Sequence, residues 1–210
     1  PSVAAVVPLA VAGDDAERPV AAGIHRTAGG RCLTVVPKRT VHGLAIDPLP
    51  AAPLLEAGFW RADLLHDGGF AAACGDALAA ADMAAAVVAA RADVVLEPAS
   101  RVLSGPPRSR ESAFAAGLHA ERLFWRSLAC ERATVALLAH AAEVLRDMVA
   151  TAPLGTPGML AGRLRALLEF GSCFSRTRDL RRLMSRAAAP DTDGESAGTY
   201  RIDEPHDAPQ

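Results

Sequence analysis

Residues 77–91 restrict the folds open to this chain more than any other stretch of the sequence. The segment is built mainly from alanine, with one acidic residue, Asp82, near its middle. Its larger apolar residues are Leu78, Met83, Val87 and Val88. A helix of this composition is apolar on nearly every side, so we expect it to be packed between other elements and not to lie on a surface. Asp76, which follows Gly75, is suited to cap the helix N-terminus.

Short apolar runs predict strands on both sides of this helix. The runs cover residues 3–9, 20–24, 32–36, 41–46 and 93–96. Pro98 is expected to end the last of these strands, because proline cannot donate a hydrogen bond to the sheet. Residues 56–66 predict a short helix, which Gly68 and Gly69 end because glycine tolerates the left-handed backbone conformation.

Helical composition dominates the second half of the chain. Residues 111–150 contain no proline and predict about 40 residues of helix, with a possible break near Gly117 or Ser127. Further helices are expected at residues 158–170, ending at Gly171, and from a cap at Ser175 onwards.

Three parts are therefore predicted. The expected organisation is an α/β domain over residues 1–104, a helical extension over residues 105–188 that starts with a Gly-Pro-Pro hinge, and a polar, acidic, disordered tail over residues 189–210.

Composition excludes several classes of function. Half of the 210 residues are hydrophobic and the net charge is −2, so a core can form and no basic field favours nucleic acid. No run of about 18 apolar residues indicates a spanning helix, and no signal peptide is visible. The cysteines, Cys32, Cys74, Cys130 and Cys173, show no metal-binding spacing. Separate reduced thiols and a cytoplasmic location are therefore expected.

Several short motifs follow one another at family-like spacing. Arg61 precedes Gly68-Gly69-Phe70, Asp82-Met83 comes next, and Val94-Val95-Leu96-Glu97-Pro98 follows the alanine-rich segment. Further on, Glu121-Arg122 precedes Phe124-Trp125-Arg126. In this order, over about residues 3–150, the chain resembles the C-terminal part of the family 2 glycosyltransferases. The resemblance implies an α/β fold, the C-terminal portion of a nucleotide-diphospho-sugar transferase fold, with a helical C-terminal extension.

The resemblance also implies an activity for the complete protein. Family 2 enzymes transfer a sugar from a nucleotide-diphosphate donor to a hydroxyl acceptor, with inversion. A divalent metal, Mg²⁺ or Mn²⁺, is expected in the complete enzyme to neutralise the diphosphate leaving group, held by an Asp-x-Asp motif that would precede Pro1. This chain would supply the acceptor-side wall, hold no cofactor or metal itself, and be inactive alone.

The sequence departs from the family pattern where the chemistry depends on it. The family's Glu-Asp pair falls on Ala79 and Ala80. The second acid of that pair is expected to be the general base for the acceptor hydroxyl, a role that alanine cannot fill. Ser104 stands near the place of a histidine that is frequent in the family. These departures favour the alternative of a non-catalytic, degenerate glycosyltransferase-like module for binding or scaffolding.

Each candidate site residue has a structural alternative. Asp82 and Asp76 are the catalytic candidates, but Asp82 could be a buried carboxylate paired with an arginine such as Arg61, and Asp76 a helix cap. The acceptor-binding candidates are Trp60, Arg61, Gly68, Gly69 and Phe70. Their alternatives are core packing of the indole and a turn that needs glycine anyway.

The C-terminal half leaves further possibilities open. A basic run, Arg176, Arg178, Arg181 and Arg182, could contact a membrane peripherally, or could be a solvated helix face. The segment 123–148 is amphipathic enough to pack on a partner or a membrane, although packing on its own domain is the default expectation. Three histidines, His66, His119 and His140, show no ligand spacing with nearby acids, so no metal site is expected.

Overall fold

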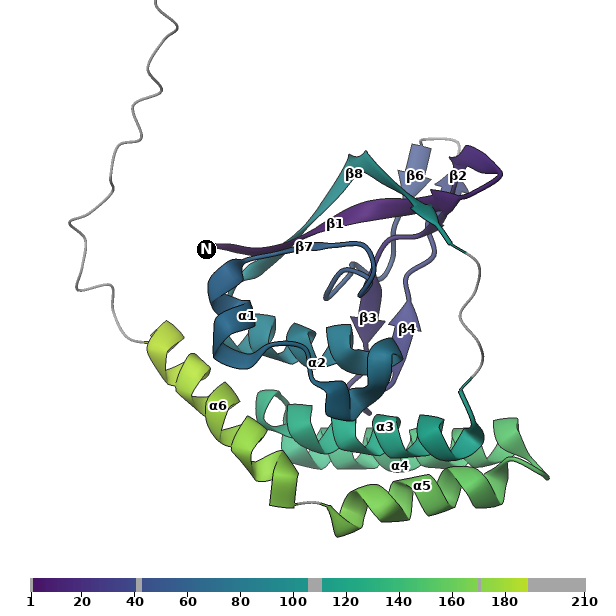
Figure 1. Ribbon diagram of the computed structural model, residues 1–210, viewed down its shortest axis with the longest axis vertical. Helices are drawn as coiled ribbons and strands as arrows, with labels where there is room; N and C mark the ends of the chain where they lie inside the picture. The colour runs from purple at the N-terminus through teal and green to yellow at the C-terminus, as the bar shows by residue number, and fades with distance from the viewer. Residues whose placement is uncertain (1, 41–42, 106–110, 170, 189–210) are drawn as a thin grey trace, which may run out of the picture.

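The computed structural model describes residues 2–40, 43–105, 111–169 and 171–188. Its sheet is built around β1 (Val3–Ala12), an apolar strand that is buried along most of its length. β8 (Asp93–Ser104) runs parallel to one edge of β1, while β2 (Asp15–Ala21) and β7 (Phe59–Trp60) pair antiparallel with the other edge. Figure 1 shows this mixed sheet above the helices. The α/β class is thereby confirmed.

Two hairpins follow β2. β3 (Ile24–Arg26) pairs with β4 (Cys32–Thr34), and β5 (Lys38–Thr40) pairs with β6 (Gly43–Ala45). The predicted strands at 32–36 and 41–46 correspond to β4 and β6, with residues 41 and 42 outside the described part of the chain. The strand predicted at 20–24 is wrong in its bounds, because the chain turns at Gly23, whose φ of +80° favours glycine.

The sequence predicted that Pro98 ends the last strand, and this prediction is wrong. β8 continues to Ser104, and the register with β1 shifts at the proline. Pro8 is paired with Glu97 and Leu9 with Arg101, so three residues bulge out of the ladder. Pro98 is tolerated in this bulge because a residue outside the ladder does not have to donate a backbone hydrogen bond to β1.

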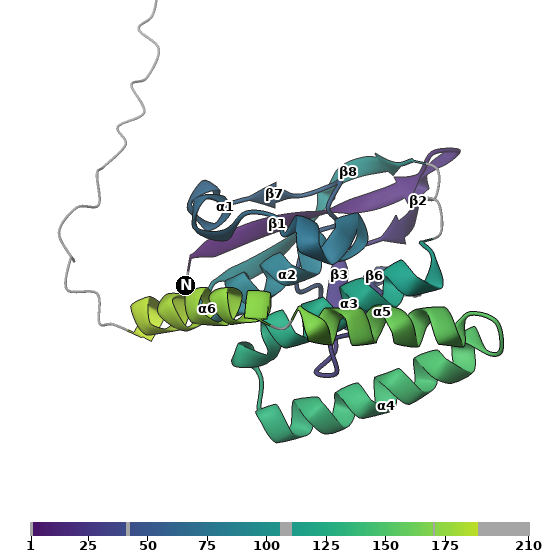
Figure 2. The ribbon, with the colours of Figure 1, turned by 60° about the horizontal axis from the view of Figure 1, so that its bottom comes forward.

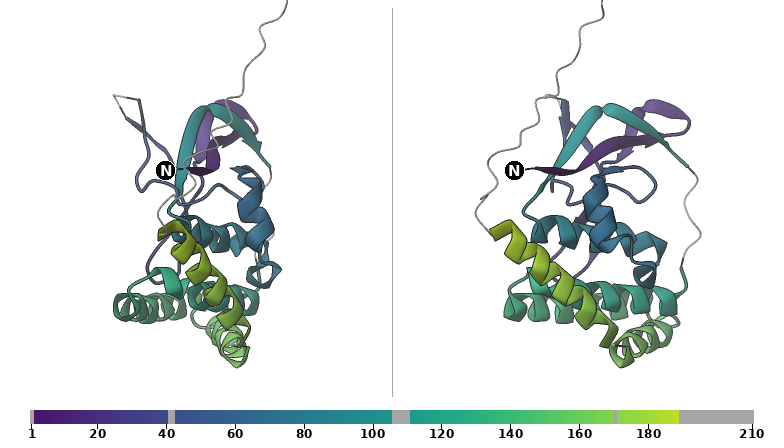
Figure 3. Two further views of the ribbon diagram at one scale, coloured as in Figure 1. Left: turned by 90° about the vertical axis from the view of Figure 1, so that its left-hand side faces the viewer. Right: turned by 60° about the vertical axis from the view of Figure 1, so that its left-hand side comes forward.

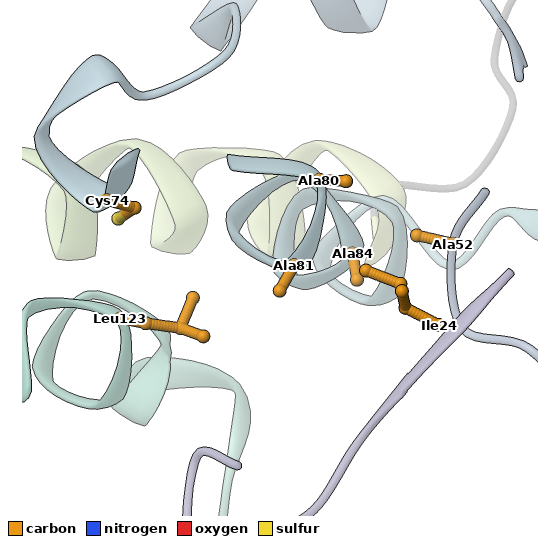
Figure 4. Close-up of a cluster of buried hydrophobic side chains, with 7 residues drawn as sticks. All are labelled: Ile24, Ala52, Cys74, Ala80, Ala81, Ala84 and Leu123. Carbon is orange, nitrogen blue, oxygen red and sulfur yellow. The ribbon is translucent and has the colours of Figure 1, made fainter. Parts of the chain in front are cut away.

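The alanine-rich helix is buried over most of its length, as predicted, although Val88 near its C-terminus is 53% exposed. α2 (Gly75–Ala89) contacts α1 (Ala62–Gly68), β3 and two later helices, and residues 79–86 are at most 4% exposed. Met83 and Val87 pack against Ala4 of β1 and Leu64 of α1. Figure 4 shows a second cluster around this helix: Ile24, Ala52, Cys74, Ala80, Ala81, Ala84 and Leu123. Alanine permits this close approach because it brings no bulk to any face.

The start of α2 differs from the prediction. The N-cap is Cys74, the last residue of a short 3₁₀ turn (Ala72–Cys74), and it makes no side-chain capping bond. Asp76 therefore lies inside the first turn, where its charge suits the helix dipole but does not cap the helix. α1 also starts later than predicted, because Phe59 and Trp60 are held in β7 and Arg61 becomes its N-cap.

Four longer helices follow β8. They are α3 (Ala113–Ser127), α4 (Ala133–Thr151), α5 (Thr156–Leu168) and α6 (Gly171–Ala188), with a 3₁₀ turn (Leu128–Cys130) after α3. The predicted break at Ser127 is confirmed. The predicted helix end at Gly171 and cap at Ser175 are wrong, because α5 ends at Leu168 and α6 already begins at Gly171.

The layers stack in a fixed order. Figures 2 and 3 show the strands on one side, α2 in the middle and α3, α4 and α5 beyond it, with α6 crossing the end of α2. The tail predicted at residues 189–210 and the hinge residues 106–110 lie outside the described part of the chain. Within the described residues, no helix is both long and apolar enough to cross a bilayer.

Gly117 marks a helix crossing and not a helix break. A Cβ atom at Gly117 would lie 2.2 Å from the Met159 carbonyl oxygen, and one at Gly162 would lie 2.1 Å from the Phe114 carbonyl oxygen. Both obstacles are backbone atoms, which cannot move aside as a flexible side chain would. The two glycines therefore allow α3 and α5 to pack with their backbones almost touching.

We expect Gly162→Ala to lower the free energy of unfolding by about 1–3 kcal/mol, because the added methyl forces α3 and α5 apart. Urea denaturation measures this change. Gly158→Ala in the same helix is the matched control, because a Cβ atom there meets only ordinary contacts at 3.7 Å. The control should be neutral or stabilising, since alanine favours helix over glycine. Equal effects of the two substitutions would contradict the close crossing.

Candidate functional site

Asp82 is the most completely buried of the predicted site residues, at 1% exposure. Arg126 of α3 donates two hydrogen bonds to it, from Nε to Oδ1 at 2.8 Å and from Nη2 to Oδ2 at 3.2 Å. Nη2 of Arg176 on α6 lies 3.0 Å from Oδ2 as well. Both carboxylate oxygens are therefore engaged by guanidinium groups, an arrangement that ties α2 to α3 and α6.

The carboxylate of Asp82 stabilises the charged form of Arg126. Burial opposes the charged form of Arg126, but the hydrogen bonds to Asp82 and its charge outweigh burial and raise the pKa of Arg126. The sequence predicted an arginine as the structural partner of Asp82, which is correct, but Arg61, the candidate named, is not that partner. Arg61 instead donates to Asp63 at 2.6 Å and to the Ser2 hydroxyl at 2.6 Å, on the outer side of α1. The geometry of Asp82 thus favours its structural alternative.

The predicted acceptor-binding residues are grouped around α1. Trp60 and Phe70 meet edge to face with ring centroids 5.7 Å apart. The indole also packs against both core clusters beside α2, and its Nε1 has no hydrogen-bond partner among the described residues. Gly68 is the last residue of α1, and Gly69 caps the helix with φ +55°. Core packing and a glycine turn therefore account for most of this group, whereas Phe70 remains 40% exposed.

A hollow lies beside Ala80, the position at which the resemblance in sequence predicts a missing general base. It has a volume of about 290 Å³, and Ala80, Asp76, Glu56, Cys32 and Leu78 are among the residues that line it. Asp76 is exposed, whereas Ala79 and Ala80 are 4% and 2% exposed. The structure thus places Asp76 and the Ala80 position on one hollow. Asp82 is not among the residues that line it.

A second hollow, of about 270 Å³, shares Cys32 and Leu78 with the first. It lies between the β3–β4 turn and helices α3, α4 and α5. Small residues of α3, such as Ala116, Gly117 and Ala120, line it and leave the space open. We call these two spaces the base-side hollow and the helical hollow.

Glu121, His140, Asp147 and Arg163 form a network beside the helical hollow, and the last three of them line it. Oε2 of Glu121 accepts from Nη1 of Arg163 at 2.7 Å and lies 3.0 Å from Nε2 of His140. Arg163 also donates to Asp147 at 2.5 Å, and Trp125 donates to Oε1 of Glu121 at 2.8 Å. These side chains come from α3, α4 and α5 and join the three helices.

His140 bridges this network to the β3–β4 turn. Its Nδ1 lies 3.0 Å from the carbonyl oxygen of Gly29, so each of the two ring nitrogens faces an oxygen atom that can accept a hydrogen bond. The ring stacks on Phe124 with centroids 3.7 Å apart. Burial alone would raise the pKa of Glu121, but hydrogen bonds from His140, Arg163 and Trp125 and the charge of His140 hold that pKa below its ordinary value.

The helical hollow lacks an activated cysteine nucleophile. Burial raises the pKa of Cys32 to about 11, despite the opposing charge of Arg26, so the thiol stays protonated at neutral pH. Among the described residues, no three His, Cys, Asp or Glu side chains are grouped as metal ligands. We therefore assign no thiol chemistry to this space.

Sequence reasoning did not identify the Glu121–His140–Arg163 network. Glu121 was noted only as part of a family motif, and His140 only as a non-ligand. The sequence does place single charged residues among apolar residues of these helices. Such a pattern indicates that each charge has a partner in the fold, but it does not identify the partner.

No protein-family model, no curated protein and no solved structure matches this chain.

Proposed function

We propose that this chain is a non-catalytic, glycosyltransferase-like binding module. The resemblance in sequence supplies the family, and one observation supports the loss of catalysis. The acid that remains from the family motif, Asp82, is 1% exposed and held by two arginines. A general base must reach the proton it removes, so a carboxylate in this state is poorly placed to act on an acceptor.

The base-side hollow supports the binding role. It lies beside Ala80, where the family carries its base, and it is lined by apolar side chains together with Asp76 and Glu56. A hollow with an apolar wall and few polar groups is the usual form of a small-molecule site. The fold would thus keep the acceptor-side wall of a sugar-transfer cleft without the acid that runs the reaction.

The test is release of nucleotide diphosphate from UDP-glucose with Mg²⁺ or Mn²⁺ present. We expect no release above a protein-free blank for the wild type, Asp76→Asn or Asp82→Asn. Calorimetry with the same donor should show no heat, because the resemblance places the donor site outside this chain. Release above the blank by the folded wild type would contradict the proposal.

A second candidate is that the complete protein still transfers a sugar from a nucleotide-diphosphate donor to a hydroxyl, with Asp76 as the base. Its support is that Asp76 is exposed and shares the base-side hollow with the Ala80 position. Turnover that survives Asp82→Asn and disappears in Asp76→Asn would favour this candidate.

A further inference from the structure

We propose that the outer face of α4 pairs with the same face of a second copy of this chain. α4 is the outermost helix of its layer, as Figure 2 shows. Five large apolar side chains on it are exposed, Leu137 among them at 43%. The other four share one face of the helix: Val135 is 55% exposed, Leu138 75%, Leu145 63% and Val149 80%. Continuous apolar surface of this kind marks an interaction site in a folded protein.

The spacing of these side chains indicates the kind of partner. Together with exposed Ala142 they stand at positions 135, 138, 142, 145 and 149, which alternate by three and four residues. This is the heptad pattern of a coiled-coil seam. Val135, Ala142 and Val149 occupy the first position of successive heptads, and Leu138 and Leu145 occupy the fourth. In parallel coiled coils, this combination favours pairs of helices over trimers or tetramers. We call these five residues the α4 seam.

The helix cannot turn to bury the seam within its own chain. Ala136 and His140, on the opposite side of α4, are 1% and 9% exposed. His140 and Asp147 are held by the network with Glu121 and Arg163. The inward face of α4 is thus fixed by ion pairs, and the α4 seam remains outside.

Charge favours a second copy over a membrane. All of α4 lies in the described part of the chain, and Arg146 is the only exposed charged residue on this helix. Helices that lie on membranes carry a polar face rich in lysine and arginine, whereas the polar face of α4 is turned inward. A parallel pair would set Arg146 beside the uncharged Ala141 of the second copy, so the pair would place no like charges opposite each other there.

The size of the seam sets the expected strength. Nineteen residues of helix extend about 28 Å at 1.5 Å per residue. Specific interfaces bury about 800 Å² on each partner, which so short a seam does not exceed. We therefore expect a two-fold dimer that dissociates on dilution, an association that does not depend on the proposed function.

Sedimentation velocity over a concentration series tests the interface. The wild type should shift from monomer to dimer as concentration rises, and Leu138→Glu with Leu145→Glu should remain monomeric. Leu168→Glu on α5, where leucine is 82% exposed, is the matched control and should leave the dimer intact. A wild type that is monomeric throughout, or a dimer that survives the double substitution, would overturn the proposal.

Cysteine cross-linking provides a second measurement that needs no loss of folding. Ala142→Cys lies at the centre of the α4 seam and should form an intermolecular disulfide at least about tenfold faster than Ala150→Cys, because an interface raises the effective thiol concentration. Ala150 is also exposed on α4 but lies off the seam. Equal rates would contradict the pairing. Flotation of a monomeric wild type with anionic vesicles, lost in Leu138→Glu, would assign the face to a membrane instead.

Discussion

Asp82→Asn is expected to lower the free energy of unfolding by about 3–5 kcal/mol, because removing one member of a buried ion pair leaves the others uncompensated. The side chains of Arg126 and Arg176 are 14% and 4% exposed, so water cannot take over from the lost carboxylate. The amide NH₂ of asparagine would also face the guanidinium groups of Arg126 and Arg176, which can only donate hydrogen bonds. Urea denaturation followed by circular dichroism measures the loss.

Asp76→Asn is the matched control for this prediction. Both acids lie on α2, but Asp76 is exposed in the first turn and contributes at most about 1 kcal/mol through the helix dipole. If Asp82→Asn is as stable as the control, the carboxylate has no structural role and the catalytic interpretation regains its support.

Glu121→Gln is expected to have an effect of similar size, a loss of about 3–5 kcal/mol at neutral pH. Glutamine keeps the volume but removes the charge that Arg163 and His140 face across 2.7 and 3.0 Å. Glu121 is 4% exposed and Arg163 is 6% exposed, so solvent does not replace the lost interaction. Loss of the carboxylate should loosen α3, α4 and α5 together.

The same residue gives a pH dependence with a defined sign. Because the pKa of Glu121 is lowered on folding, its contribution is fully present above its ordinary pKa of 4.5 and is lost as the pH falls through the folded value. The stability difference between wild type and Glu121→Gln should therefore shrink as the pH falls below about 4.5. A difference that is unchanged at lower pH would show that the carboxylate is not held in its charged form.

The sequence predicted best those elements whose pattern is local. Residues 77–91 are apolar on nearly every side, and residues 79–87 of the helix are buried. The strand from Val3 and the break at Ser127 also follow from runs of a few residues. Pro98 misled because its effect depends on the register with β1, which no local pattern contains.

The candidate site was harder to predict because its contacts join distant parts of the chain. Asp82 meets Arg126 44 residues later, and His140 meets the carbonyl of Gly29 111 residues earlier. The composition around Asp82 showed that a buried acid needs a partner, and that inference was correct. The identity of the partner arginine depends on how α3 and α6 cross α2, which no local pattern contains. For this reason the named candidate, Arg61, was not the partner.

The coupling energy between Asp82 and Arg126 tests most directly whether this acid is structural. It is obtained from a double-mutant cycle of Asp82→Asn, Arg126→Gln and the double variant, measured by urea unfolding. We predict that the double variant loses clearly less stability than the two single losses combined, with a coupling above about 1 kcal/mol. A double variant that folds where Asp82→Asn does not would be the same result in a stronger form. Losses that simply add, within about 0.5 kcal/mol, would contradict a buried structural pair.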